Sequence, residues 1–166
     1  VLGLAGRIAD GVLYSGGLSL ASIRKSAVFA EEGLKKADRD PSAFRRAGFV
    51  YFACSEDGKT AIESNRRKIA FLFRNSAQAD NIASVDVSID HGAIMDLVKQ
   101  RKLEEAAQMV PPEAVPQFTV AGTPKECRDQ LQAYIDAGVD EPVIEVSGSE
   151  EEKRLALDVI REFTGG

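Results

Sequence analysis

The feature that most constrains this chain is a unit of helix, turn and short apolar strand that occurs three times. Strands are expected at Val12–Tyr14, Gly48–Cys54 and Val143–Val146, each followed by small or polar residues before a new helix. Strands that alternate with helices form parallel sheets. Gly48–Cys54 is apolar on both faces, which is typical of a strand covered on both sides. The pattern therefore predicts an α/β fold with parallel strands.

Amphipathic patterns predict the helices between these strands. They are expected over Leu2–Ala9, Ser19–Ala37, Lys59–Phe73, from Thr123 to Gly138, and from Glu150 onward. The run Thr123-Pro124-Lys125-Glu126 has the composition of a capping box with proline at the first helical position.

The region 75–118 departs from this alternation. Asn75–Asp90 is polar and irregular, and a helix with a break near Lys102 is expected over Gly92–Val110, followed by the proline-rich loop Pro111–Pro116. We interpret this region as a helical segment inserted over one edge of the sheet, within a single domain that spans 1–166.

Composition excludes several classes of function. The 21 basic and 26 acidic residues are mixed, the net charge is −5, and no Lys/Arg-rich tract indicates a nucleic-acid partner. No apolar run approaches the ~20 residues that a membrane helix requires. Cys54 and Cys127 lack metal-ligand spacing and are interpreted as two buried thiols of a cytoplasmic protein, so no metal site is expected.

The first residues carry no signal-peptide pattern and no initiator Met, and they already have the character of a helix interior. This start predicts a fragment, a processed chain, or a chain whose front half is absent from the sequence.

The strongest candidate site is the glycine-rich segment Ser15-Gly16-Gly17, where the first strand ends. Backbone N–H groups without side chains around them bind phosphate or carboxylate well. The alternative is an ordinary tight turn, for which glycine is common. Tyr14 is either a core aromatic residue or a wall against a cofactor ring.

Further candidates follow the other two strands. Ser55, Glu56 and Ser147 could contact a substrate, although Glu56 and Asp57 also suit the cap of the next helix. For the remaining polar candidates we favour structural interpretations. The lone His91 is expected to be a surface or capping group, Arg66-Arg67-Lys68 a solvated helix face, and Glu150–Glu152 the start of a helix. Glu145 lies inside a strand, where a buried carboxylate would need a partner.

Three segments together resemble one enzyme family. The run from Ala5 to Val12 (AGRIADGV), the run from Gly122 to Cys127 (GTPKEC) and the run from Gly138 to Val143 (GVDEPV) resemble, in order and spacing, motifs of the bacterial-luciferase-like flavin and deazaflavin oxidoreductases. The Tyr-Ser-Gly-Gly segment is more similar to the branch that uses coenzyme F420, which includes methylenetetrahydromethanopterin reductase.

The resemblance implies the carboxyl-terminal half of a TIM (β/α)₈ barrel, with the three expected strands as barrel strands six, seven and eight. Active sites of such barrels lie where the strands end. This implies one rim on which Tyr14, Ser15, Gly16 and Gly17 bind the cofactor and Ser55, Glu56 and Ser147 bind the substrate. Leu18 stands where sugar-phosphate enzymes of the family carry a lysine, which argues against a sugar-phosphate substrate.

The implied activity is hydride transfer between F420, or alternatively FMN, and a small organic substrate; no catalytic acid or base can be assigned. Two rival functions stay open. One is an FMN-dependent monooxygenase, and the other is a non-catalytic half-barrel that pairs with another chain. Expected partners are the deazaflavin or flavin, a small-molecule substrate, and either a second copy or the missing amino-terminal half.

Overall fold

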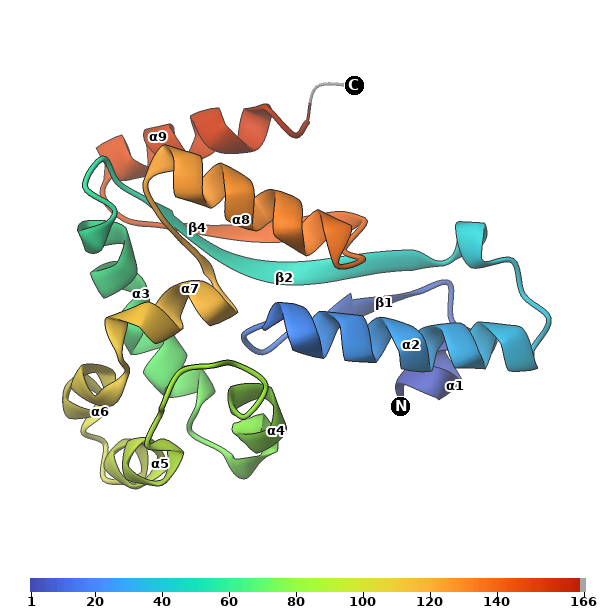
Figure 1. Cartoon of the computed structure of the whole chain (residues 1–166), viewed down its shortest axis with the longest axis horizontal. Helices are drawn as coiled ribbons and strands as arrows, with labels where there is room; N and C mark the ends of the chain where they lie inside the picture. The colour runs from blue at the N-terminus through green and yellow to red at the C-terminus, as the bar shows by residue number, and fades with distance from the viewer. Residues whose placement is uncertain (165–166) are drawn as a thin grey trace.

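The computed structural model describes residues 1–164, and its centre is a sheet of four parallel strands (Figure 1). The strands are β1 (Gly11–Tyr14), β2 (Arg45–Cys54), β3 (Val120–Gly122) and β4 (Glu141–Ser147). The longest strand, β2, pairs in parallel with each of the other three. The predicted α/β class and the parallel sheet are therefore confirmed.

The two edges of β2 are used differently. Along one edge, β4 pairs with Ala47–Ala53. The opposite edge is shared, because β1 pairs with Arg45–Gly48 and β3 pairs with Phe52–Cys54. The strands β1, β2 and β4 thus follow one another across the sheet, and β3 lies beyond the end of β1.

The sequence analysis missed β3 and started β2 three residues late. Val120–Gly122 is buried but too short for any periodicity to show, and it forms because the end of β2 offers it a free edge. The charged residues Arg45 and Arg46 hid the start of β2, where the strand pairs with β1.

The helices agree with the predicted alternation. Those outside the inserted segment are α1 (Leu2–Ile8), α2 (Leu20–Lys36), α3 (Lys59–Leu72), α8 (Pro124–Asp136) and α9 (Glu150–Arg161). The predicted capping box of α8 is present: the Thr123 hydroxyl accepts from the Glu126 N–H, and the Glu126 carboxylate accepts from the Thr123 N–H at 2.8 Å. Ser149 and Glu152 form a second box, so the acidic residues there begin α9 as expected.

The inserted segment is made of short helices. They are α4 (Ala79–Ile82), α5 (His91–Lys99), α6 (Leu103–Met109) and α7 (Val115–Phe118), with single 3₁₀ turns at Ser76–Gln78 and Pro112–Ala114; a further 3₁₀ turn, Pro41–Ala43, precedes β2. The predicted break lies between α5 and α6, where Arg101 has a positive φ of 62°. Together with α3, these helices enclose their own apolar core, in which the Phe73 and Phe118 rings meet edge to face at 4.9 Å.

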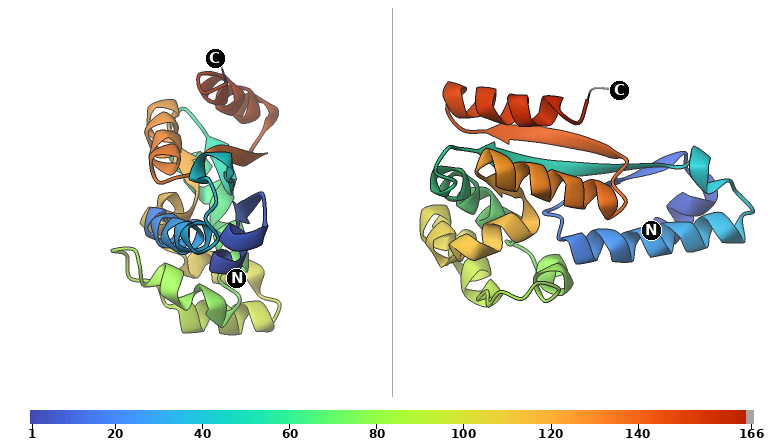
Figure 2. Two further views of the ribbon diagram at one scale, coloured as in Figure 1. Left: turned by 90° about the vertical axis from the view of Figure 1, so that its right-hand side faces the viewer. Right: turned by 45° about the horizontal axis from the view of Figure 1, so that its top comes forward.

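One face of the sheet carries the main core. Val50, Phe52 and Cys54 of β2 pack with buried residues of α2, α8 and α9, and Figure 2 shows α2 and α8 on the same side of β2. Side chains alternate along a strand, so Phe49 and Tyr51 point to the opposite face, where they are only half-buried.

The opposite face is open in the described part of the chain, and we call it the open face. Leu13 and Val143, with 54 % and 44 % of their surface exposed, lie on it beside Phe49 and Tyr51. Of the cover expected on both sides of β2, residues 1–164 therefore supply all of it on one face and only the part near Ala53, which is buried, on the other. The apolar character of both faces of β2 reflects one packed face and one uncovered face.

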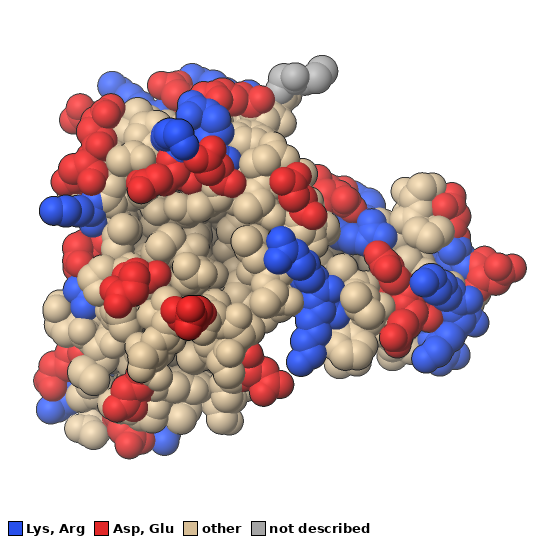
Figure 3. Space-filling view, in the orientation of Figure 1, with Lys and Arg blue, Asp and Glu red and all other residues tan. Residues whose placement is uncertain are grey.

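The charge distribution agrees with the composition. Figure 3 shows acidic and basic side chains interspersed over the face that carries α2 and α8. Within residues 1–164 no helix is long and apolar enough to span a membrane, and no group of three or more metal-ligating side chains comes together.

Candidate cofactor and substrate sites

The segment Ser15-Gly16-Gly17 forms a glycine loop between β1 and α2. Gly16 and Gly17 have positive φ angles of 101° and 77°, which favour glycine. Their carbonyl oxygens accept hydrogen bonds from the Gln78 and Asn81 side-chain amides, at 2.8 Å and 2.6 Å. Within the described part of the chain their N–H groups donate no hydrogen bond. The loop therefore offers free donors, as the sequence predicted.

Asn81 fixes this loop through four contacts. Its amide nitrogen donates to Gly17 and to the Gln78 side-chain oxygen, the latter at 3.0 Å. Its oxygen accepts from the hydroxyls of Ser19 and Ser22, at 2.7 Å and 2.6 Å. Ser19 is also the N-cap of α2. One side chain of the inserted segment thus joins the glycine loop to the start of α2.

Sequence reasoning missed Gln78 and Asn81. They lie in the segment expected to be irregular, 62 and 64 residues beyond the glycines that they hold. A local pattern carries no signal for such a contact. The only hint was the polarity of Asn75–Asp90 next to a glycine-rich strand end.

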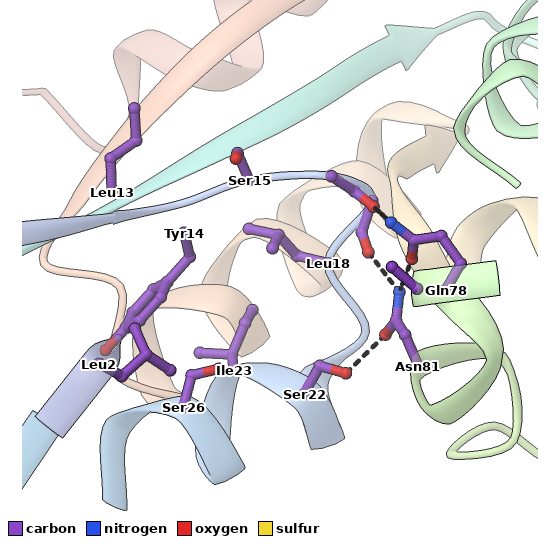
Figure 4. Close-up of a pocket in the computed structure, with 13 residues that line it drawn as sticks. Leu2, Leu13, Tyr14, Ser15, Leu18, Ser22, Ile23, Ser26, Gln78 and Asn81 are labelled. Carbon is purple, nitrogen blue, oxygen red and sulfur yellow. Dashed lines mark hydrogen bonds between the residues drawn. The ribbon is translucent and has the colours of Figure 1, made fainter. Parts of the chain in front are cut away.

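A cavity of about 340 Å³ opens beside the glycine loop. Its lining includes Tyr14, Ser15, Ser22 and Asn81 and holds no charged side chain. In Figure 4, Ser15 and Leu13 point to one side of the loop and Tyr14 to the other. The cavity is therefore neutral and lined by hydroxyl, amide and backbone groups.

Tyr14 is a core residue that also lines this cavity. It is 5 % exposed and packs with the main core. Its hydroxyl is buried and finds no hydrogen-bond partner, and burial raises the pKa of the phenol above its ordinary value. The core alternative of the sequence analysis is thus present, and the unpartnered hydroxyl still has a hydrogen bond to offer.

Ser55 and Asp57 stabilise the turn between β2 and α3. The Ser55 hydroxyl donates to Asp57 at 2.9 Å and accepts from the Ala61 N–H at 3.1 Å. The Asp57 carboxylate accepts from the N–H of Thr60, and this bond, followed by the one from Ser55, holds the pKa of that carboxyl below its usual range. Both groups are engaged in capping α3, and Glu56 beside them is exposed.

Ser147 lies at the end of β4, and its hydroxyl accepts from the Lys68 ammonium at 2.6 Å. The same ammonium forms an ion pair with Glu145. Lys68 is therefore the partner that the strand-borne Glu145 required, and the sequence could not identify it because 77 residues separate the two.

The strand ends that carry the predicted site residues are staggered along the sheet. The last pair of β1 with β2 is Tyr14 with Gly48, whereas β2 continues six residues further, to Cys54. At ~3.3 Å per residue, β2 therefore extends about 20 Å beyond its last pair with β1. Ser147 pairs near the end of β2, with Ala53. The glycine loop reaches toward that end, because a Cβ on Gly17 would lie 3.1 Å from Leu72 of α3.

The other polar candidates hold the structure together. His91 Nε2 lies 2.9 Å from the Phe73 carbonyl oxygen, and its ring meets the Phe73 ring. Arg66 donates to the carbonyls of Val110 and Gln108, and Arg67 pairs with Glu104 at 2.6 Å. Both arginines connect the inserted helices to α3. The solvated helix face expected for Arg66-Arg67-Lys68 is therefore wrong for Arg66, whose side chain is only 12 % exposed.

Cys54 and Cys127 are both free and buried, as expected. Cys127 donates through its thiol to the Ala53 carbonyl at 3.3 Å. Burial raises the pKa of both thiols, so they stay protonated and act as small core residues.

Parallel strands with helices packed on one face of the sheet define a piece of a β/α-barrel-type fold. Residues 1–141 match the family described as luciferase-like monooxygenase, and the chain belongs to that family. The resemblance drawn from the three sequence motifs is thereby confirmed.

Several members of the family are similar to the chain in sequence. It is 28 % identical to the 5,10-methylenetetrahydromethanopterin reductase of Methanopyrus kandleri, over 95 % of this chain and 45 % of that protein. It is 27 % identical to the F420-dependent glucose-6-phosphate dehydrogenase 1 of Rhodococcus jostii, over 92 % and 42 %. The chain spans about half the length of the curated relatives it matches.

The solved structure of the coenzyme F420 dependent tetrahydromethanopterin reductase from Methanopyrus kandleri superimposes with a TM-score of 0.80 at 25 % identity. The match covers 98 % of this chain and 48 % of that one. This agreement confirms the luciferase-like TIM-barrel fold for the chain.

Proposed function

We propose that this chain is part of an oxidoreductase that uses coenzyme F420, with the glycine loop as a contact for the anionic part of the cofactor. The observation that carries the proposal is the pair of free N–H groups at Gly16 and Gly17, held in place by Gln78 and Asn81. The F420 dependence of the relatives supports the choice of cofactor.

The residues present fit such a group. Backbone N–H groups recognise a phosphate without a side-chain charge, and the start of the 17-residue helix α2 adds a positive potential nearby. The exposed Ser15 hydroxyl makes no hydrogen bond within the described residues, so it is free to donate as well. The cavity contains no carboxylate that would repel an anion.

When bound, F420 supplies hydride-transfer chemistry to a carbon centre of a small substrate. The chain's own contribution is to bind and orient. The glycine loop donates hydrogen bonds, and Asn81 keeps its carbonyls turned away from an incoming anion. The apolar residues of the open face exclude water from a ring laid against them.

Titration of the protein in its full natural length with F420 and, separately, with FMN tests this proposal. We expect saturable binding of F420, followed through its visible absorbance, with a lower Kd than for FMN. Tighter binding of FMN would favour the monooxygenase alternative. Absence of binding for both would contradict the proposal.

A glycine substitution ties the binding to the loop. In Gly17→Ala the new Cβ would lie 3.1 Å from Leu72 at a φ of +77°, and the resulting strain of ~1–3 kcal/mol should raise the F420 Kd about tenfold or more. Gly92→Ala is the matched control, because its Cβ would meet no atom closer than 3.6 Å. Equal Kd values for both variants would show that the loop does not contact the cofactor.

A further inference from the structure

A second polar cluster lies on the open face of the sheet, between α3 and β4. Lys68 reaches from α3 to β4, where its ammonium bonds Glu145 and the Ser147 hydroxyl. The same ammonium lies 5.1 Å from the centre of the Tyr51 ring. We call Lys68, Glu145, Ser147 and Tyr51 the lysine cluster.

The cluster differs from an ordinary surface ion pair. Exposed pairs hold few further contacts and contribute little to stability, whereas the Lys68 side chain is only 29 % exposed and has an aromatic ring, a hydroxyl and a carboxylate around it. Tyr51 and Glu145 are partners in the β2–β4 register, so two rigid strands fix their spacing.

Lys68, Glu145 and Tyr51 of the cluster line a cavity of about 570 Å³, larger than the one at the glycine loop. Tyr51 and Phe71 supply aromatic walls to it, and its polar lining is Lys68, Glu145, Arg67 and Ser64. Two aromatic side chains beside a polar group form a place in which a flat ring can lie with one edge toward the charges.

The unused hydrogen-bonding groups of the lysine cluster determine which edge of a ring it can bind. Of the three Lys68 donors, one goes to Glu145 Oε1 and one to Ser147, which leaves one free. Glu145 Oε2 accepts no bond within the described residues, and the Ser147 proton is not donated. Within the cavity the cluster therefore offers the Glu145 Oε2 acceptor beside a free Lys68 donor.

We propose that the lysine cluster binds the lactam edge of a planar heterocycle, an N–H next to a C=O. Glu145 accepts from the N–H and Lys68 donates to the carbonyl oxygen, while Ser147 holds the Lys68 ammonium in place. Two ligands could supply such an edge: the cofactor, through its pyrimidinedione ring, or a heterocyclic substrate. For this choice of ligands the proposal rests on the proposed function.

Binding of lumazine, a fluorescent pteridinedione, to the full-length protein tests the proposal. The matched ligand is 1,3-dimethyllumazine, which keeps the carbonyls and ring but has no N–H. Loss of a charge-assisted hydrogen bond should make the dimethyl compound bind about tenfold more weakly. Equal affinity for the two compounds, or no lumazine binding, would overturn the proposal.

Two variants connect the binding to the cluster. Glu145→Gln should raise the lumazine Kd about tenfold, because the carboxylate acceptor is lost. Glu141→Gln is the control: Glu141 lies on the same strand and also forms an ion pair, with Arg45 at 2.6 Å, but does not line the cavity. An equal effect of both variants would assign the loss to β4 as a whole and overturn the proposal.

Measuring the F420 Kd of Glu145→Gln distinguishes the two sources. A parallel tenfold rise assigns the lactam edge to the cofactor, and an unchanged value assigns it to a substrate. Wild-type protein that binds lumazine through its N–H but binds neither F420 nor FMN would contradict the proposed function and still support the lysine cluster.

Discussion

Asn81 is the residue on which the shape of the glycine loop depends most. Its amide satisfies one loop carbonyl and two hydroxyls, one of them the N-cap of α2. An asparagine amide has donors and acceptors at opposite ends, and both ends are used here. No smaller side chain can reproduce these contacts at once.

Replacing Asn81 with alanine should weaken both the cofactor site and the fold. The lost bonds leave the Gly17 carbonyl and the two hydroxyls without this partner, at a cost of ~1–3 kcal/mol in the free energy of unfolding. The F420 Kd should rise about tenfold. Asn75→Ala is the control, because Asn75 only caps the turn at Ser76–Gln78. An unchanged Kd in the Asn81 variant would remove the loop from the cofactor site.

Asp57 gives a prediction with a defined pH dependence. Its pKa is lowered in the folded chain, chiefly by the Thr60 N–H and then by the Ser55 hydroxyl. A lowered folded pKa contributes stability that is present above the unfolded value, ordinarily 3.8, and is lost as the pH falls through the folded value.

Asp57→Asn should therefore be less stable than wild type in urea unfolding at pH 7, and the difference should shrink below pH 3.8. The control is Asp80→Asn, since Asp80 is exposed and forms no hydrogen bond or ion pair within the described residues. A gap between Asp57→Asn and wild type that is constant down to acid pH would contradict the capping role.

At the scale of elements, the inserted helices both form a core and hold the site. Phe118 of α7 is 1 % exposed, meets Phe73 edge to face, and lies close to Gly17. The packing of α7 against α3 therefore supports the glycine loop, in addition to the amide contacts of Gln78 and Asn81.

Phe118→Ala should cost ~3–5 kcal/mol in the free energy of unfolding, because it removes a fully buried ring. Chemical unfolding measures this loss. Phe118→Leu should cost less, since it restores most of the apolar volume. An exposed aromatic, Phe29 on α2, is the control, and Phe29→Ala should change stability by less than about 1 kcal/mol. A small effect of Phe118→Ala would show that the inserted helices contribute little to the core.

The helices and strands also show how much of the structure can be predicted from the sequence. Helices with strong periodicity and caps, such as α2 and α8, are evident from the residues, because local interactions fix them. The strand β3 was missed because it exists only through its pairing with β2. The contacts of Asn81 and Lys68 join positions more than 50 residues apart, and no local pattern encodes such distances.

At the scale of the whole molecule, the described residues do not cover the open face with side chains of their own. Leu13 and Val143 are exposed on the same face as the half-buried Phe49 and Tyr51. A contiguous apolar surface of this kind marks a place where another surface packs. The chain spans about half the length of its relatives, and the solved relative that it superimposes on is a longer chain.

The 166-residue chain prepared alone should therefore self-associate through the open face. Sedimentation velocity should give a mass above the 17.9 kDa of one chain, and Leu13→Asp should shift it back toward that value, because a carboxylate on the face opposes burial. Val28→Asp is a matched control: Val28 is equally exposed, at 53 %, but lies on α2 on the other side of the sheet. If both variants and the wild type sediment as monomers, the open face needs no cover, and the apolar residues on it must serve a ligand instead.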